Sequence, residues 1–216
     1  MLAQGSGMTS VRTRTRMLER LRAQGICDEA VLSVMGQIPR HAFVDEALAH
    51  KAYDDVSLPI GFAQTISQPY IVARMSELVN AVPQHGIILE IGTGCGYQTS
   101  ILAKLFKTVH SIERIGGLVR NTRDRLGELQ IHNARLRHAD GSKGLPELAP
   151  FDAILITAAA PIVPENLMDQ LAMGGRLVFP VGDSDQELRM IERLPDGFTE
   201  TRLEKVKFVP MLPGTV

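Results

Sequence analysis

The chain of 216 residues carries 23 basic and 24 acidic side chains, so its net charge of −1 gives no electrostatic reason to bind nucleic acid or anionic membranes. No stretch approaches the ~20 apolar residues of a membrane span, and no signal-peptide core opens the chain. Its two cysteines, Cys27 and Cys95, have neither disulfide nor zinc-ligand spacing, which is typical of the reducing cytoplasm. We therefore expect a cytoplasmic protein without a metal, and a monomer, since no oligomerisation helix is evident.

Residues 9–80 are predicted to be helical and irregular. Met17, Leu18 and Leu21 form the apolar side of a first helix, which Gly25 ends. The later predictions for this part are a helix that Asp28 caps and that continues to Met35, a short helix over 41–50, a loop over 53–65 and a helix over 69–80.

The first helix also carries a cluster of arginines. Two interpretations are open: an RNA-binding arm or a solvated helix face. No aromatic platform for stacking bases accompanies the arginines, which favours the solvated face. The cluster comprises Arg12, Arg14, Arg16, Arg20 and Arg22.

From residue 87 onward, short apolar segments alternate with helical ones. This alternation predicts an α/β fold with a doubly wound, mostly parallel, seven-stranded sheet that finishes antiparallel. Strands are expected at 87–91, 108–112, 134–138, 152–157, 176–181, 187–194 and 201–208. Helices are expected at 98–106, 116–129, 143–148 and 164–172, with Gly174-Gly175 as a helix end or tight turn. We predict a disordered extension over 1–8 and a single domain over 9–216, in which a helical part (9–80) precedes the sheet and C-terminal strands (81–216).

The most informative segment follows the first of these strands. Residues 87–91 are apolar except for Glu90, and glycine occupies Gly92, Gly94 and Gly96 directly afterwards. Glycine allows the backbone to turn tightly and a ligand to approach it closely. The helix that follows offers unpaired N–H groups to an anionic or polar ligand. The segment therefore predicts a nucleotide-like ligand.

The spacing of the glycines indicates which nucleotide. A dinucleotide fingerprint needs glycine at its sixth position, where this chain has Tyr97. The pattern Glu-x-Gly-x-Gly-x-Gly is instead typical of enzymes that use S-adenosylmethionine. Glu113 ends the second strand, where it can accept hydrogen bonds from ribose hydroxyls, and Asp140-Gly141 follows the third strand, where an acidic loop can meet adenine.

A second polar segment, Gln64-Thr65-Ile66-Ser67-Gln68-Pro69, precedes the helix over 69–80. A serine at this position is more often a helix cap than a catalyst. No histidine and aspartate lie nearby in the sequence, so a nucleophilic triad is not predicted.

Taken together, these segments resemble the protein-L-isoaspartate O-methyltransferase family in its bacterial form. The Gln-Thr-Ile-Ser element and the C-terminal Phe-Val-Pro are more specific than the glycine motif, which many methyltransferases share. The resemblance covers nearly everything after Met8. Its matching segments are Val31 to Val44, Ala52 to Asp54, Leu58 to Gly61, Gln64 to Pro69, Leu89 to Gln98, Ser111 to Arg114, Asp140 to Gly144, Ala149 to Ile154, Gln170 to Gly175, Pro180 to Gly182 and Phe208 to Pro210.

The resemblance implies a fold of the class I S-adenosylmethionine-dependent methyltransferase type. It also implies that Ser67 is the catalytic side chain, and that Thr65 and Val209 contact the substrate. The cofactor, S-adenosylmethionine with S-adenosylhomocysteine as product, would be held by Glu90, Gly92, Gly94, Gly96, Glu113, Asp140 and Gly141.

Three positions depart from the family pattern. Ala63 and Ala139 stand where the family usually has glycine, and an alanine would be strained at either position if the backbone there needs a positive φ. Cys95 replaces the usual serine between glycines, a small-for-small exchange that we expect to be tolerated.

The activity that the resemblance implies is methylation of the free α-carboxylate of L-isoaspartyl residues in damaged proteins and peptides. A carboxylate is ionised at neutral pH, so this reaction needs no general base. A methyltransferase acting on RNA or a small molecule remains an alternative, and so does a non-catalytic binding module. A nicotinamide oxidoreductase is disfavoured by Tyr97.

Overall fold

The computed structural model describes residues 7–216, which form a seven-stranded sheet flanked by helices and a separate two-stranded hairpin. The extension predicted over 1–8 lies mostly outside the described residues, and Gly7–Thr9 form a short 3-10 helix, η1. The α-helices are α1 (Val11–Ala23), α2 (Glu29–Gln37), α3 (Pro69–Asn80), α4 (Tyr97–Leu105), α5 (Gly116–Glu128) and α6 (Glu165–Met168). The other 3-10 helices are η2 (Arg40–Phe43), η3 (Glu46–Lys51), η4 (Gly141–Lys143) and η5 (Pro146–Leu148).

The large sheet has the strand order β5-β4-β3-β6-β7-β8-β9. Its first five strands in that order are parallel, and β8 and β9 add an antiparallel end, which confirms the predicted fold class. The strand order reverses between β3 and β6, where doubly wound sheets bind their ligands beyond the carboxyl ends of the strands. The strands are β3 (Ile87–Ile91), β4 (Thr108–Glu113), β5 (Ala134–His138), β6 (Phe151–Ile156), β7 (Leu171–Val181), β8 (Gln186–Leu194) and β9 (Gly197–Val206).

Alternate side chains of the central strand β3 enter two separate hydrophobic layers. Ile88 packs in the layer formed with α3, α4 and α5, whereas Leu89 and Ile91 pack in the layer that includes Leu167 of α6. Both layers exclude water because these side chains are nearly or fully buried. The sheet is therefore buried on both faces, as the apolar run at 87–91 predicts.

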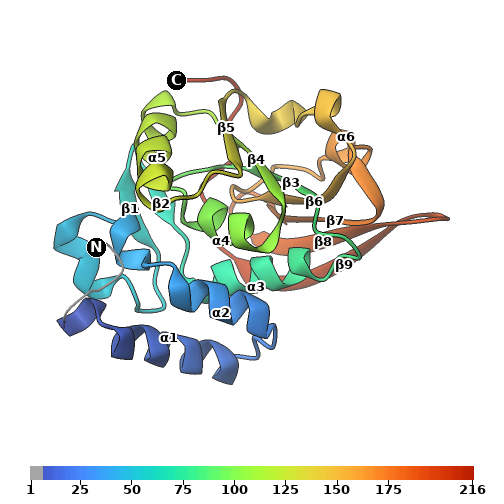
Figure 1. The fold of residues 1–216 in the computed structure, drawn as a ribbon. Helices are drawn as coiled ribbons and strands as arrows, with labels where there is room; N and C mark the ends of the chain where they lie inside the picture. The colour runs from blue at the N-terminus through green and yellow to red at the C-terminus, as the bar shows by residue number, and fades with distance from the viewer. Residues whose placement is uncertain (1–6) are drawn as a thin grey trace.

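The N-terminal helices form an outer layer. Figure 1 shows α1 and α2 stacked below α3 and α4, on one side of the sheet. Met17 and Leu21 of α1 are fully buried, as predicted. The arginine cluster is only partly a solvated face: Arg14 is buried and donates to the Gly36 carbonyl. Arg20 is half-buried and donates to the Tyr53 carbonyl.

The prediction of a loop over 53–65 is wrong in part, because this segment includes most of a hairpin formed by β1 (Leu58–Gly61) and β2 (Gln64–Ile66). Its turn is Phe62-Ala63, and both residues have positive φ, 52° and 54°. Two positive φ values are the mark of a type I′ turn, which normally contains Asn-Gly or Gly-Gly. The sequence therefore lacks the usual hairpin signal. Ala139 is not among the described residues with positive φ. Of the two alanines at which backbone strain was predicted, only Ala63 therefore has the strained conformation.

Several predicted helices are shorter in the structure. The segment 41–50 forms two 3-10 helices, η2 and η3, and the helix over 143–148 is replaced by η4 and η5 on either side of Gly144, whose φ is 62°. The helix over 164–172 is reduced to α6, because the chain from Leu171 pairs with Phe151 as part of β7. Gly174-Gly175 consequently lies inside a strand, beside a shift in the pairing register, and not at a helix end.

The turn at Ala63 supports a stability prediction. A left-handed conformation costs a residue with a Cβ about 1–2 kcal/mol, which glycine avoids at a smaller entropic cost. We expect Ala63→Gly to raise the free energy of unfolding by about 0.5–1 kcal/mol, measured by denaturant unfolding. Ala139→Gly is the control and should be neutral or destabilising. An equal gain from both substitutions would contradict the explanation by the turn.

Candidate functional site

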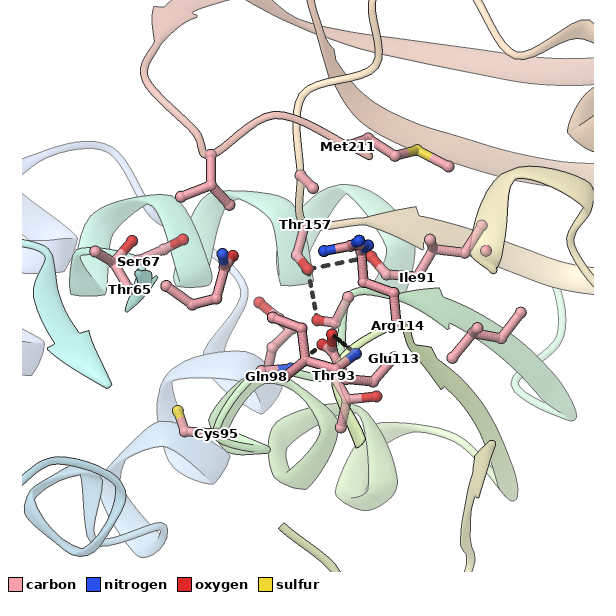
Figure 2. Close-up of a pocket in the computed structure, with 18 of the residues that line it drawn as sticks. Thr65, Ser67, Ile91, Thr93, Cys95, Gln98, Glu113, Arg114, Thr157 and Met211 are labelled. Atoms are coloured by element: carbon pink, nitrogen blue, oxygen red, sulfur yellow. Dashed lines mark hydrogen bonds between the residues drawn. The ribbon is translucent and has the colours of Figure 1, made fainter. Parts of the chain in front are cut away.

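A cavity that is partly open to solvent lies at the carboxyl ends of β3, β4 and β6. Figure 2 shows Thr65 and Ser67 on one side of it and Glu113 and Arg114 on the other. The cavity is thus at the switch point of the sheet, where doubly wound sheets bind their ligands. Among the predicted site residues, it is lined by Thr65, Ser67, Gly92, Gly94, Glu113, Gly141 and Val209.

At two of its glycines, Gly92 and Gly96, the glycine loop is packed so closely against its neighbours that a side chain would clash. Gly92 has a φ of 101°, and a Cβ there would lie 2.3 Å from the Thr157 Oγ1. Gly96 has a φ of 86°, and its Cβ would lie 2.5 Å from the Thr122 Cγ2. Gly96 does not line the cavity itself but lets the chain turn into α4, whose N-cap it is. At Gly92 and Gly94 the loop therefore presents backbone without a side chain to the cavity.

Glu113 holds this loop in place. It is nearly buried at the end of β4, and its Oε2 accepts the Gly94 N–H at 2.9 Å while its Oε1 accepts the Ile115 N–H at 2.9 Å. Each carboxylate oxygen has a second lone pair, so the group can still accept hydrogen bonds from a ligand. Glu113 thus combines a structural contact with a place in the cavity wall, at the strand tip where the sequence predicts a ribose contact.

Glu90 lies beneath the glycine loop and outside the cavity lining. It is fully buried, and its Oε2 accepts two hydroxyl hydrogen bonds of 2.5 Å, from Thr99 and Ser111. Ser111 in turn bonds the Thr93 hydroxyl of the loop at 2.6 Å. Burial raises the pKa of Glu90 to about 8, although the two hydroxyl donors oppose this shift. Its predicted contact with a cofactor stays a prediction, and its visible role is to support Thr93.

The raised pKa of Glu90 has a consequence for stability. Between the ordinary carboxyl pKa of 4.5 and about 8, the folded state binds a proton that the unfolded chain has released, so stability falls as pH rises. Glutamine cannot titrate. Between pH 6 and pH 8, we expect the free energy of unfolding of the natural chain to fall by about 2 kcal/mol relative to that of Glu90→Gln, measured by urea unfolding. Glu128→Gln, at an exposed position, should show no such trend, and a pH-independent difference for Glu90→Gln would contradict the assignment.

Asp140 also lies outside the cavity lining, and it binds the C-terminal segment. Its Oδ2 accepts the Gly214 N–H at 2.7 Å and its Oδ1 accepts the Ser142 N–H at 2.8 Å. These two donors, chiefly Gly214, lower the pKa of Asp140. Met211 and Leu212 of the same segment line the cavity, so Asp140 fixes part of the wall without reaching it. Its predicted contact with adenine stays a prediction.

Ser67 lies between β2 and α3 and is half-buried at the cavity wall. Its carbonyl accepts a hydrogen bond from Arg40, whereas its hydroxyl bonds no residue within the described part of the chain and is available to a ligand. It is not the side-chain cap of α3, since the N-cap residue is Gln68. Thr65 is exposed two residues earlier, and Val209 contributes from the C-terminal side.

Several residues of the cavity wall are not predicted from the sequence. Thr157 follows β6 and donates from its hydroxyl to the Ile91 and Gly92 carbonyls, at 3.1 and 2.6 Å (Figure 2). The rule that ligands bind where the strand order reverses could have found Thr157, because β6 is the neighbour of β3 across that point. Arg114 and Gln98 also line the cavity, but nothing in the sequence pattern singles them out.

Two further properties concern membranes and metals. Within residues 7–216, no helix has both the length and the apolar composition that crossing a bilayer requires. The same part of the chain contains no cluster of three or more histidine, cysteine, aspartate or glutamate side chains placed to hold a metal ion. Both cysteines are free thiols, Cys27 exposed and Cys95 buried in the glycine loop.

The sheet order, the glycine loop after β3 and the acidic residue ending β4 define a class I methyltransferase fold with its cofactor cavity. The comparisons with known proteins narrow this class. A model of the protein-L-isoaspartate(D-aspartate) O-methyltransferase family matches residues 12–215, and the chain belongs to this family.

Named relatives agree over nearly the full length. A protein-L-isoaspartate O-methyltransferase of Nitrosomonas eutropha is 59% identical over 214 residues, which are 98% of this chain and 96% of the relative. The second enzyme of that name in Nitrosospira multiformis is 60% identical over 207 residues, or 96% of this chain and 98% of the relative. A crystal structure from Plasmodium falciparum, described as a protein-L-isoaspartate O-methyltransferase in complex with S-adenosyl-L-homocysteine, has a TM-score of 0.81 at 28% identity and covers 92% of this chain and 98% of its own.

Proposed function

We propose that this chain methylates the free α-carboxylate of L-isoaspartyl residues in damaged proteins and peptides, using S-adenosylmethionine. The observation that carries the proposal is the free hydroxyl of Ser67 at the wall of the same cavity that the glycine loop lines. The match to the family over residues 12–215 supports it. Val209, in the C-terminal Phe-Val-Pro segment that is typical of the family, also lines this cavity.

The residues present fit the cofactor. Gly92 and Gly94 line the cavity without side chains, so a ligand can approach their backbone closely. Gly92 and Gly94, with the remaining lone pairs of Glu113, would hold the cofactor, and the backbone of Gly141 lines the cavity beside them. When bound, S-adenosylmethionine supplies a methyl group on a positively charged sulfur.

The protein's own contribution is then positioning. The attacking carboxylate has an ordinary pKa of about 3.3 to 3.9 and is ionised at neutral pH, so no base has to deprotonate it. None of the cavity-lining residues in the described chain is a histidine, and both Glu113 oxygens already accept backbone N–H groups. The Ser67 hydroxyl can donate one hydrogen bond that orients the carboxylate. Alignment of reacting atoms can supply roughly 7–11 kcal/mol.

The later steps of the repair need no group of this protein. The methyl ester cyclises to a succinimide as the neighbouring backbone nitrogen displaces methanol, and water then opens the ring, in part to normal aspartate. The proposal includes a monomer that acts in the cytoplasm on isoaspartyl proteins, with neither nucleic acid nor membrane as a partner. The net charge of −1 supports the last point. Light scattering on the purified protein tests the monomer.

A paired peptide assay tests the activity. An isoaspartyl peptide and its aspartyl twin differ only in which carboxyl group is free, so they have the same composition and charge. We expect labelled methyl transfer to the isoaspartyl peptide and at least 100-fold less to its twin. Equal methylation of both peptides, or no transfer to either, would contradict the proposal. Methylation of RNA in place of the peptides would favour a different methyltransferase of the same fold.

A further inference from the structure

Arg40 of η2 is fully buried, yet it is paired with no carboxylate in residues 7–216. An isolated buried cation is costly unless hydrogen bonds compensate it. Burial lowers the pKa of Arg40, which expresses the same cost. The chain therefore maintains a guanidinium in its interior at an energetic cost, and its contacts indicate why.

The contacts of Arg40 join three segments that are distant in the sequence. Its Nε donates to the Ala52 carbonyl and its Nη2 donates to the Ser67 carbonyl, both at 2.7 Å. The centre of the guanidinium lies 4.9 Å from the centroid of the Tyr97 ring, over its face. Tyr97 is the first residue of α4 and directly follows the glycine loop. One rigid planar group thus connects the serine segment with the end of the cofactor loop.

Both ends of this connection belong to the cavity. Ser67 and Tyr97 line it, whereas Arg40 does not. At Ser67 the division is clear: the carbonyl is held by Arg40, and the hydroxyl is free to bind a ligand. A hydroxyl on a mobile backbone could not hold a carboxylate in line, so the fixed carbonyl is what gives the free hydroxyl a defined direction.

Stability alone does not account for the arrangement. The Arg40 Nη1 and the Tyr97 hydroxyl are both buried, and within the described part of the chain they interact electrostatically but form no well-aligned hydrogen bond. Replacing a buried charged cluster by apolar side chains is often neutral or stabilising. An interior built only for stability would not need a buried cation whose contact with the neighbouring hydroxyl is so poorly aligned.

We propose that Arg40 is a positioning residue for methyl transfer, which sets the backbone of Ser67 relative to the first turn of α4. The inference rests on the proposed function, because it assigns Arg40 a role through Ser67. Arg40 itself touches neither substrate nor cofactor. Lysine cannot replace it fully, because an ammonium lacks the planar fork that reaches two carbonyls while stacking on a ring.

The test compares Arg40→Met and Arg40→Lys with Arg20→Met. Arg20 is a matched control, because its Nη2 donates to the Tyr53 carbonyl at 2.7 Å, next to Ala52 but away from Ser67. The measurements are kcat with an isoaspartyl peptide, Kd for S-adenosylhomocysteine and amide hydrogen exchange of residues 64–70. All are made well below the melting temperature of each variant.

We expect Arg40→Met to lower kcat about 30- to 100-fold, with less than a threefold change in Kd, and to speed exchange over 64–70. Arg40→Lys should recover part of the loss, and Arg20→Met should lose stability while its kcat stays within twofold. If Arg40→Met does not fold, the test uses Arg40→Lys, whose kcat is expected to be at least fivefold below that of the natural chain.

Two outcomes would overturn the inference: unchanged kcat in the Arg40 variants, or a kcat loss matched by an equal loss of cofactor affinity. Failure of the proposed function is distinguishable, because the natural chain would then methylate no isoaspartyl peptide. In that case the exchange rates decide: protection of 64–70 that does not depend on Arg40 refutes its positioning role.

Discussion

Replacing Ser67 with alanine is expected to lower kcat for an isoaspartyl peptide by about 100-fold or more, while the Kd for S-adenosylhomocysteine changes by less than twofold. The carbonyl of Ser67 is bound by Arg40, whereas its hydroxyl bonds no residue within 7–216. Without that hydroxyl the carboxylate loses its orientation, and misplacement of reacting atoms by about 1 Å can cost 10²-fold. The measurements are initial rates of methyl transfer and calorimetric titration with the product cofactor.

The comparison variant is Ser67→Thr, which keeps the hydroxyl and should retain more activity than Ser67→Ala. Ser33→Ala, on the exposed side of α2, controls for the loss of a hydroxyl as such and should leave kcat unchanged. Loss of cofactor affinity equal to the loss of kcat would show that Ser67 shapes the cofactor cavity and does not orient the substrate. A covalent adduct between substrate and Ser67, detected by mass spectrometry, would likewise contradict the orienting role.

The sheet could be predicted from the sequence because each of its parallel strands is a local signal. Residues 87–91 are an apolar run interrupted only by Glu90, and the following segment 108–113 contributes the buried Val109 and Ile112. The order of the residues alone places Gly92 and Glu113 at neighbouring strand ends. Such strands need no information about distant parts of the chain. Element ends were less predictable, because pairing decides them: Leu171 joins β7 through its partner Phe151, not through its own helix propensity.

The features that the sequence conceals depend on contacts across the fold. The hairpin turn at Ala63 has no glycine, and its conformation is imposed by the pairing of β1 with β2. Asp140 looks like a free acid in the sequence, but the C-terminal Gly214 occupies one of its oxygens. Arg40 reads as an ordinary surface residue, because arginine is rarely buried, and only the folded chain brings Ala52 and Ser67 to it.

The glycine loop supports the second large prediction. Gly92→Ala should abolish detectable binding of S-adenosylhomocysteine, a loss of at least 100-fold in affinity. Alanine at a φ of 101° is strained, and its Cβ would lie 2.3 Å from the Thr157 Oγ1, so either the loop or Thr157 has to move. Thr157 itself is held by the Ile91 and Gly92 carbonyls, which leaves little freedom for it to retreat. Isothermal titration calorimetry measures the affinity, and circular dichroism checks that the fold persists.

Gly127→Ala is the matched control, because the position is helical, its φ is not positive and an added Cβ meets nothing within 4 Å. This variant should bind the cofactor normally and be more stable by about 0.5–1 kcal/mol, because alanine is favoured over glycine inside a helix. The double variant Gly92→Ala/Thr157→Ala separates the two causes of the loss at Gly92. Removal of the Thr157 side chain relieves the clash but not the backbone strain, so affinity should return only in part. Near-normal binding by Gly92→Ala alone would mean that the glycine loop can move to accommodate a side chain. The inference that its contacts hold it rigidly would then be wrong.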